Sequence, residues 1–351
     1  MQTDLELNDG FGFELPSIDW LPDESFYSLC SRLHRLFGHA QPAATARLLF
    51  GHSRRGSQPA FPTRLAQFIS RTRGAFGTSV ERILRSHSIA AFYFPWRTLR
   101  SRTLAVQACA SGNLRALRAE LAAPQTDDKI PLRYCQQCAA NDRSSSGVAY
   151  WHLCHQFPGV WICIHHNLAL TYIEPRYLQG LSVFNQWHLP LDFARLGTIP
   201  LRSYAPQLSN RLERQAHIAT RVAKLHDDFR IDYVKLHQTY MDAIAAKGWK
   251  SVEDSYEARQ FRQHWITGNA RGEVDEARNG RSSHLKFDHR LTKALFRPEL
   301  DTDPVFHIML IAWLFKDWNE FAVAYGSSCC NDPYQNDGIG AARSAIGLAK
   351  T

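Results

Sequence analysis

The chain has 351 residues with a formal net charge of +8, and 44% of its residues are hydrophobic and 21% charged. This is the composition of an ordinary globular protein, long enough for two or three domains and for a core without disulfides. Because the first residues are acidic and polar and no run of 18 apolar residues occurs, we expect no secretion signal, no membrane span, and a cytoplasmic, nucleoid-associated protein.

Charge is distributed unevenly along the chain. Residues 1–24 contain seven acids and no base, whereas residues 41–119 contain thirteen arginines, no lysine and a single acid, Glu81. The second block therefore carries a charge of +12. A solvated basic surface is one explanation, and a polyanion-binding face is the other. Arginine in place of lysine favours planar, bidentate contacts with phosphate or with guanine edges.

The N-terminal residues predict an extended acidic arm over 1–22 and then a helix. Asp23 is the predicted N-cap of this helix and Gly38 its end, since the apolar residues between them recur on one helical face. A second short helix is predicted over 42–50, with a proline at its first position.

Two helices joined by a short turn are predicted after a polar, arginine-bearing loop. Thr63 is expected to cap the first helix, and the capping box of Thr78 and Glu81 to start the second. A four-residue turn with two glycines is expected between them. This is the pattern of a helix-turn-helix motif and also of an ordinary αα-corner, and the density of arginines favours a role in DNA binding.

The predicted DNA contacts are all arginines of this basic block. Arg82 and Arg85 are expected to be exposed on the second helix, because its apolar residues lie on the opposite side. The full predicted set comprises Arg54, Arg55, Arg71, Arg73, Arg82 and Arg85.

The aromatic segment 89–96 is expected to close the first domain, and a short helix is predicted over 113–122. A linker over 123–131 should then lead to a segment rich in cysteine and histidine. The later part predicts three amphipathic helices, near 209–229, 232–247 and 253–267. A flexible insert is expected over 268–283 and a last strong helix over 303–325.

Two pairs of metal-ligating residues follow the linker. Cys135 and Cys138 form a C-x2-C pair, and after 24 intervening residues Cys163 and His166 form a C-x2-H pair. Zinc takes four such ligands in a tetrahedron, so the two pairs predict one structural Cys3His zinc site. A thioredoxin-like redox pair is the alternative, and we disfavour it because no helix is expected after Cys138.

Other residues nearby also have ligand chemistry: His152, Cys154, His155 and His165. Their spacing fits a second pair less well than that of Cys163 and His166. A catalytic zinc needs an open coordination position and an acid/base carboxylate, and the H-x-E and H-E-x-x-H signatures are absent here. We therefore expect no enzyme, and because a Walker A loop is also missing, any ATP hydrolysis should come from a partner.

The motifs around the metal ligands resemble the TniQ/TnsD family of transposition target-selection proteins. Tyr150–Trp151–His152 and Pro158–Gly159 lie between the two ligand pairs in the order typical of that family. "LPDESFYSLCSRLHRLFG" and "SHSIAAFYFPW" extend the resemblance to about residues 13–190, and "DTDPVFHIMLIAWLF" is a weaker echo of the family's later helical region.

The resemblance implies a zinc-bound core with helix-turn-helix elements and no enzymatic activity. It also implies binding to double-stranded target DNA together with recruitment of an AAA+ ATPase regulator of the TnsC/TniB type. The longest family members extend further at the C-terminus, which puts independent reading of a long attachment site in doubt. The alternative is an adaptor that links an RNA-guided CRISPR effector to the transposition machinery, and a homodimer stays open.

The resulting prediction is a mainly α protein with a helix-turn-helix-bearing N-terminal domain, a central zinc-finger module and a C-terminal helical domain. A zinc hydrolase and a plain zinc-bearing transcription regulator are the less favoured alternatives. The predicted parts are an acidic arm, an arginine-rich domain, a zinc module, a helical domain and a flexible tail, over 1–22, 23–122, 131–172, 205–326 and 327–351.

Overall fold

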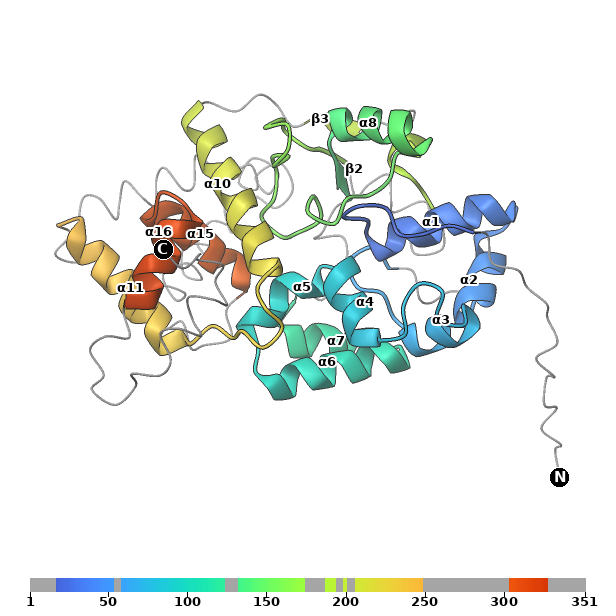
Figure 1. Cartoon of the computed structure of the whole chain (residues 1–351), viewed down its shortest axis with the longest axis horizontal. Coiled ribbons are helices and arrows are strands. Elements are labelled where there is room, and N and C mark those ends of the chain that lie inside the picture. Colours follow the sequence, from blue (N-terminus) through green and yellow to red (C-terminus); the bar gives the residue numbers. More distant parts are fainter. Residues whose placement is uncertain are drawn as a thin grey trace, which may run out of the picture.

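The computed structural model describes residues 17–53, 58–123, 132–173, 187–193, 198–200, 206–248 and 303–327. Within these ranges the chain is mainly α-helical, as predicted, with one small three-stranded sheet. In Figure 1 the N-terminal helices α1–α7 lie on one side, the sheet and α8 lie above, and α10 connects them to α11, α15 and α16 on the other side. The predicted helix at 253–267, the insert at 268–283 and the tail beyond 327 lie outside the described residues.

The N-terminal part is a cluster of short helices. Their bounds are Phe26–Phe37 for α1, Pro42–Phe50 for α2, Leu65–Arg71 for α3, Val80–His87 for α4, Ala90–Tyr93 for α5, Phe94–Trp96 for the 3-10 helix η1, Leu99–Ser111 for α6 and Leu114–Leu121 for α7. The predicted helices at 42–50 and 113–122 are confirmed. The sequence reading missed α6, which has no clean apolar stripe because Leu99 and Leu104 are exposed on it.

Local capping explains where α1 begins and ends. The hydroxyl of Ser25 accepts a hydrogen bond from the backbone N–H of Ser28, so Ser25 is the N-cap. The prediction that Asp23 caps the helix is therefore wrong. Gly38 ends the helix as predicted, because its φ of 63° is the left-handed conformation in which its N–H reaches the carbonyl of Arg35.

The link between α3 and α4 is longer than predicted. It runs over 72–79, and Ser79 rather than Thr78 caps α4 by accepting the N–H of Arg82. Arg64, not Thr63, is the residue that precedes α3. Residues 73, 74 and 77 have positive φ angles, and this left-handed backbone ends α3 early and lengthens the turn.

An aromatic core holds the N-terminal helices together. The ring of Phe68 lies 4.8 Å from that of Phe26 and 5.7 Å from that of Phe50, and all three side chains are buried. Every residue of the segment 89–96 is also buried, which confirms the expected closing role of this segment. Phe92 stacks on Phe157, so the same core continues into the cysteine-rich region.

The central region is built on three short antiparallel strands in the order β1–β2–β3. Their bounds, with those of the neighbouring helices, are Arg133–Tyr134 for β1, Thr171–Ile173 for β2, Thr198–Pro200 for β3, Gln136–Ser146 for α8 and Pro190–Phe193 for the 3-10 helix η4. Arg133 pairs with Tyr172, and Tyr134 with Thr171. This register ties the segment that enters α8 to the chain that leaves the metal-ligand region.

The C-terminal helices are α10 (Pro206–Ala223), α11 (Tyr233–Ala246), α15 (Pro304–Leu314) and α16 (Trp318–Ser327). The prediction of one helix from Asp303 to about Tyr325 is wrong, because the backbone is extended at Phe315. Asp317 then starts a new helix by accepting the N–H of Glu320, whose own carboxylate accepts the N–H of Lys316.

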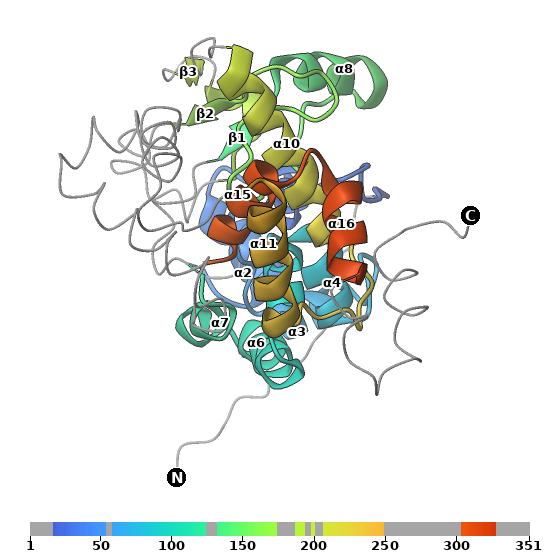
Figure 2. The same cartoon turned by 90° about the vertical axis from the view of Figure 1, so that its left-hand side faces the viewer.

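The C-terminal helices pack on the N-terminal cluster through one continuous hydrophobic core. His307 of α15 stacks on Trp96 with ring centroids 4.9 Å apart, and Tyr233 donates to the carbonyl of Trp96. The backbone N–H of Ile231 donates to the carbonyl of Pro95 at 2.8 Å. Figure 2 shows α11, α15 and α16 together, with α6 and α7 below and the sheet above. The N-terminal and C-terminal helices of the described ranges thus share one core.

Burial of His307 predicts a loss of stability in mild acid. Burial and the neighbouring Arg97 lower the pKa of His307 to about 3. The unfolded chain binds a proton at His307 below about pH 6.5 and the folded chain does not, so stability should fall as the pH drops from 6.5 towards 3, by at most about 1.4 kcal/mol per pH unit.

Urea unfolding between pH 4 and pH 8 measures this loss, with His307→Phe as the comparison. The variant should show a shallower loss of stability below pH 6.5 than the parent chain. If the free energy of unfolding has the same pH dependence in the two proteins, His307 is not the cause of the loss.

Candidate metal centre and arginine surface

The four predicted metal ligands come from two turns. Cys135 directly follows β1 and precedes α8, and Cys138 lies in the first turn of that helix. Cys163 and His166 lie in a tight turn that is closed by a β-bridge between Ile162 and Ala169. Within this turn the N–H of Cys163 donates to the carbonyl of residue 168 at 2.8 Å, and its carbonyl accepts the N–H of residue 167 at 2.9 Å.

The structure brings the four ligand atoms together, all within 4.8 Å of one another. The Nδ1 atom of His166 lies 3.6 Å from the sulfur of Cys135, 3.3 Å from that of Cys138 and 3.6 Å from that of Cys163. The sulfurs of Cys138 and Cys163 are 3.7 Å apart.

These separations match a tetrahedral zinc site. With bonds of about 2.3 Å to sulfur and about 2.0 Å to nitrogen, a tetrahedron places two sulfurs about 3.8 Å apart and sulfur and nitrogen about 3.5 Å apart. The cluster has the size and the donor set to hold one metal ion, and it is compatible with zinc. Four protein side chains fill a tetrahedron, which is the ligand count of structural zinc sites.

The thiols interact strongly with one another. Hydrogen bonds from the thiols of Cys138 and Cys163 hold the pKa of Cys135 well below its usual range, and the same contacts raise the pKa of Cys138. A cluster of three thiols therefore already favours one thiolate. A divalent cation would displace the remaining thiol protons, because it binds thiolates and releases protons.

The expectation that no helix follows the pair of Cys135 and Cys138 is wrong. A short strand, β1, does precede Cys135, and α8 does follow it, as in a thioredoxin-like arrangement. What argues against that reading is the position of Cys163 and His166, which converge on the pair from the other turn.

The competing ligands lie outside the cluster. His165 is exposed, and Cys154 is buried with its pKa raised by burial. His155 is buried, and burial lowers its pKa to about 3, so the ring is neutral. Its Nε2 atom lies 3.9 Å from the sulfur of Cys138. With its proton on Nε2, this ring would donate towards the Cys138 sulfur and would support a thiolate charge from outside the coordination shell.

The tyrosine, tryptophan and histidine between the ligand pairs dock the cysteine-rich segment on the N-terminal part. The hydroxyl of Tyr150 donates to the carbonyl of Pro22, and the backbone N–H of Trp151 donates to the hydroxyl of Ser28. His152 lies 3.1 Å from a carboxylate oxygen of Asp142 on α8. The three residues thus connect α1 and the segment before it with α8.

Asp23 is a junction residue that the sequence reading misassigned. It has a left-handed φ of 56°, its carbonyl accepts the N–H of Leu153 at 2.6 Å, and its carboxylate accepts the N–H of Cys154 at 3.0 Å. A β-bridge between Glu24 and His152 continues the contact. The metal-ligand region is therefore tied to the start of the N-terminal helices by these hydrogen bonds.

The predicted DNA-contacting arginines divide into three groups. Arg71, Arg73 and Arg82 are exposed on or between α3 and α4. Arg54 and Arg55 lie outside the described residues. The expectation that Arg85 is exposed is wrong, because its side chain is only 15% exposed.

Arg85 is held by contacts within the chain. Its guanidinium group lies 3.0 Å from the carboxylate of Glu81, 3.3 Å from that of Asp227 and 4.7 Å from the ring centre of Phe94. The pairing with Glu81 has the i,i+4 spacing that sequence alone reveals. The contact with Asp227, 142 residues away, depends on the tertiary fold.

Several other arginines of the basic block are also structural. Arg102 and Arg118 are buried, and Arg64 donates to the carbonyl of Phe50. In the described part of the block the exposed arginines are Arg47, Arg71, Arg73, Arg82, Arg100 and Arg115. Fewer arginines of this region are therefore exposed to a ligand than the composition of the block indicates.

Comparison with known protein families gives one match. The TniQ family model matches residues 16–170, a range that covers α1 to α8 and all four clustered ligands. A search of curated proteins finds no match to the chain. Among the helices that the structure describes, none is long and apolar enough to cross a membrane. The resemblance drawn from the motifs is thus confirmed for residues 16–170, which match the TniQ family model and make up less than half of the chain.

Proposed function

We propose that this protein selects the target site for DNA transposition by binding double-stranded DNA and recruiting an AAA+ ATPase regulator. The TniQ family domain, built around the Cys3His cluster, is the observation that carries the proposal. The exposed arginines of α3, α4 and their turn support the DNA-binding part. The recruitment of an ATPase rests on the family resemblance, and the absence of a Walker A loop is consistent with it.

In this proposal the metal is one structural zinc, held by Cys135, Cys138, Cys163 and His166. Its role is to join the start of α8 to the second ligand turn, and so to hold the docking residues Tyr150–Trp151–His152 against α1. The protein acts through contacts and not through catalysis.

We place the DNA-binding surface on Arg71, Arg73 and Arg82, with Arg54 and Arg55, which precede α3 in the sequence, as further contacts. Arg85 positions α4 through Asp227 and Phe94 and does not itself reach DNA. A helix-turn-helix role for α3 and α4 remains part of the proposal, with a turn longer than that of the standard motif.

Loss of Arg73 or Arg82 should weaken DNA binding in a salt-dependent way. The slope of log affinity against log salt is negative, and each phosphate contact adds about 0.9 to its magnitude, so each alanine variant should reduce that magnitude by about 1. Fluorescence anisotropy with a 30-base-pair duplex at several salt concentrations measures both affinity and slope.

Arg115→Ala is the matched control, because it removes the same charge from an exposed position on α7. It should leave the slope close to that of the parent chain. If all three variants have the same slope as the parent, α3 and α4 do not form the DNA-binding surface.

An adaptor between an RNA-guided CRISPR effector and the transposition machinery is the second candidate. The withdrawal of Arg85, Arg102 and Arg118 into the fold favours it, because fewer arginines remain free to read bases. A protein that relies on an RNA-guided partner should bind unrelated duplexes with equal affinity. Affinity for one duplex at least 1,000-fold above that for the others, the usual minimum for specific binding, would favour direct DNA recognition.

A further inference from the structure

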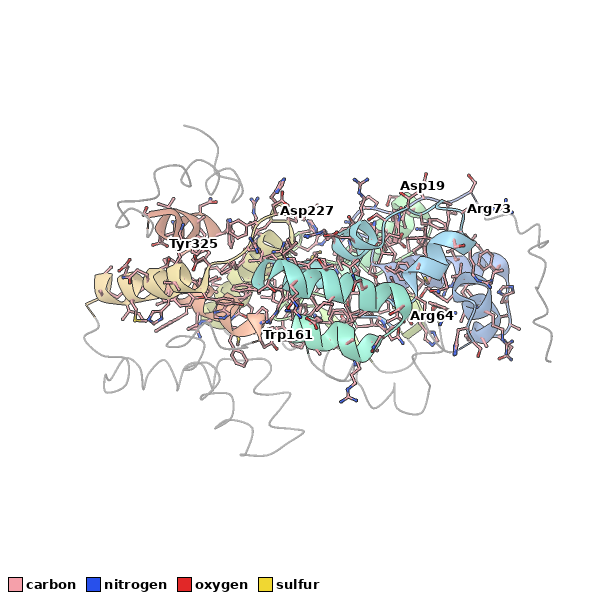
Figure 3. The ribbon with its side chains drawn as sticks, turned by 90° about the horizontal axis from the view of Figure 1, so that it is seen from below. Asp19, Arg64, Arg73, Trp161, Asp227 and Tyr325 are labelled. Carbon is pink, nitrogen blue, oxygen red and sulfur yellow. The ribbon has the colours of Figure 1, made fainter. Side chains whose placement is uncertain are left out.

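The first described residues of the chain lie beside the segment that carries the arginines of α3, α4 and their turn. Trp20 stacks on His87 of α4 with ring centroids 3.4 Å apart and planes at 7°, and its indole N–H donates to the carbonyl of Phe76 in the α3–α4 turn. Ile18 also packs on the core. The first described residue, Ser17, is exposed three residues before this anchor. In Figure 3 Asp19 and Arg73 are labelled at the same end of the molecule.

The arginines at this place have no carboxylate partner in the described structure. Arg71, Arg73 and Arg82 are exposed, and none of them forms an ion pair with a described residue. Arg73 has a left-handed φ of 50° in the turn, two residues after Arg71. Phe76, which contacts Trp20, lies three residues after Arg73 and six before Arg82. We call Arg71, Arg73 and Arg82 the arginine face.

The segment that precedes Ser17 has the complementary charge. Residues 1–16 contain Asp4, Glu6, Asp9 and Glu14 and no lysine or arginine. An extended chain spans about 3.3 Å per residue, so Glu14 reaches about 20 Å from Trp20 and Asp4 about 50 Å. All four carboxylates therefore come within reach of the arginine face from the point where Trp20 fixes the chain.

We propose that residues 1–16 dock on the arginine face of their own chain and compete there with the phosphates of DNA. Covalent attachment makes the docking intramolecular, and a short linker gives an effective concentration in the millimolar range. A contact too weak to persist between separate molecules is then occupied for much of the time. The competition with DNA rests on the proposed function; the docking itself does not.

A zero-length cross-link tests the docking without DNA. In the full chain carrying Arg73→Lys, a carbodiimide activates a carboxylate, and attack by the new amine forms an amide bond and releases the urea by-product. Peptide mapping should find this link to Asp9 or Glu14 at low salt and lose it at 0.5 M salt, where the Debye length is a few ångströms. Arg115→Lys is the control, and it should not link to residues 1–16.

DNA binding then tests the competition. The full-length variant D4N/E6Q/D9N/E14Q keeps the length of the segment and removes its charge. It should bind a 30-base-pair duplex about tenfold more tightly than the parent chain at low salt, as an effective concentration near 1 mM against a docking Kd near 0.1 mM requires. The gain should disappear when Arg73→Ala and Arg82→Ala are added.

The two experiments separate the two proposals. A cross-link from position 73 in a chain that binds no DNA supports the docking and rejects the proposed function. DNA binding without a cross-link, and with equal affinity for the parent and the neutralised variant, overturns the docking. If the neutralised variant instead loses a basic partner protein while its DNA affinity is unchanged, the segment serves that partner and the inference is wrong.

Discussion

The double variant C135S/C163S should lose its metal and fail to form the native fold. Structural zinc contributes about 10–16 kcal/mol of apparent binding free energy in zinc-finger peptides, which is as large as the whole stability of a typical domain. In this protein the cluster also anchors the segment that docks on α1, so its loss should extend beyond the two turns. Elemental analysis of the purified parent should give about one zinc per chain, and the variant close to none.

Cys154→Ser is the matched control for this prediction. Cys154 is buried in the same region but lies outside the ligand cluster, so the variant should keep its metal and lose only modest stability. A folded parent chain without bound metal would contradict the assignment of a structural zinc site. So would undiminished zinc in C135S/C163S.

Removal of the Arg102 side chain should destabilise the protein by about 3 kcal/mol or more, because hydrogen bonds from a charged group contribute about 1.5–3 kcal/mol each and this group makes several. The guanidinium group is buried and donates to the carbonyls of Phe94, Asp227 and Phe229. It thereby joins η1 to the turn between α10 and α11. Burial, with smaller contributions from Arg85 and Arg230, lowers its pKa to about 10, so the group is still charged at neutral pH.

Arg100→Ala provides the comparison, because Arg100 is exposed on the same helix two residues away. Chemical denaturation should show a change of no more than about 0.5 kcal/mol for this surface variant. Arg102→Lys should restore little of the lost stability, since one ammonium group does not reproduce the planar fork of donors. Equal unfolding midpoints for R102A and R100A would contradict a structural role for Arg102.

The metal cluster was predictable from sequence because its signal is local. Each ligand pair needs only a two-residue gap and a tight turn, and the donor chemistry of cysteine and histidine is specific. The family motifs between the pairs are equally visible. What the sequence did not reveal was the reason for Tyr150 and Trp151, because their partners lie more than 120 residues away in Pro22 and Ser28.

The caps show how closely spaced polar residues mislead a sequence reading. Asp23, Ser25, Thr78 and Ser79 all have side chains that accept backbone hydrogen bonds. The choice between them depends on backbone conformation. Asp23 adopts a left-handed φ because its carbonyl and carboxylate bind the backbone of Leu153 and Cys154, and Ser25 is left to cap α1. A distant strand-like contact therefore decided a local helix boundary.

The sequence by itself determined the mainly α character, the α1, α2 and α7 helices, the four clustered ligands and the TniQ resemblance, since each depends on short-range periodicity or on motif spacing. Only the tertiary structure decided which arginines are free. Arg82 and Arg85 are three residues apart and chemically identical, yet one is exposed and the other is bound to Asp227 and Phe94. Composition counts both charges, whereas the fold uses one of them to hold its own helices together.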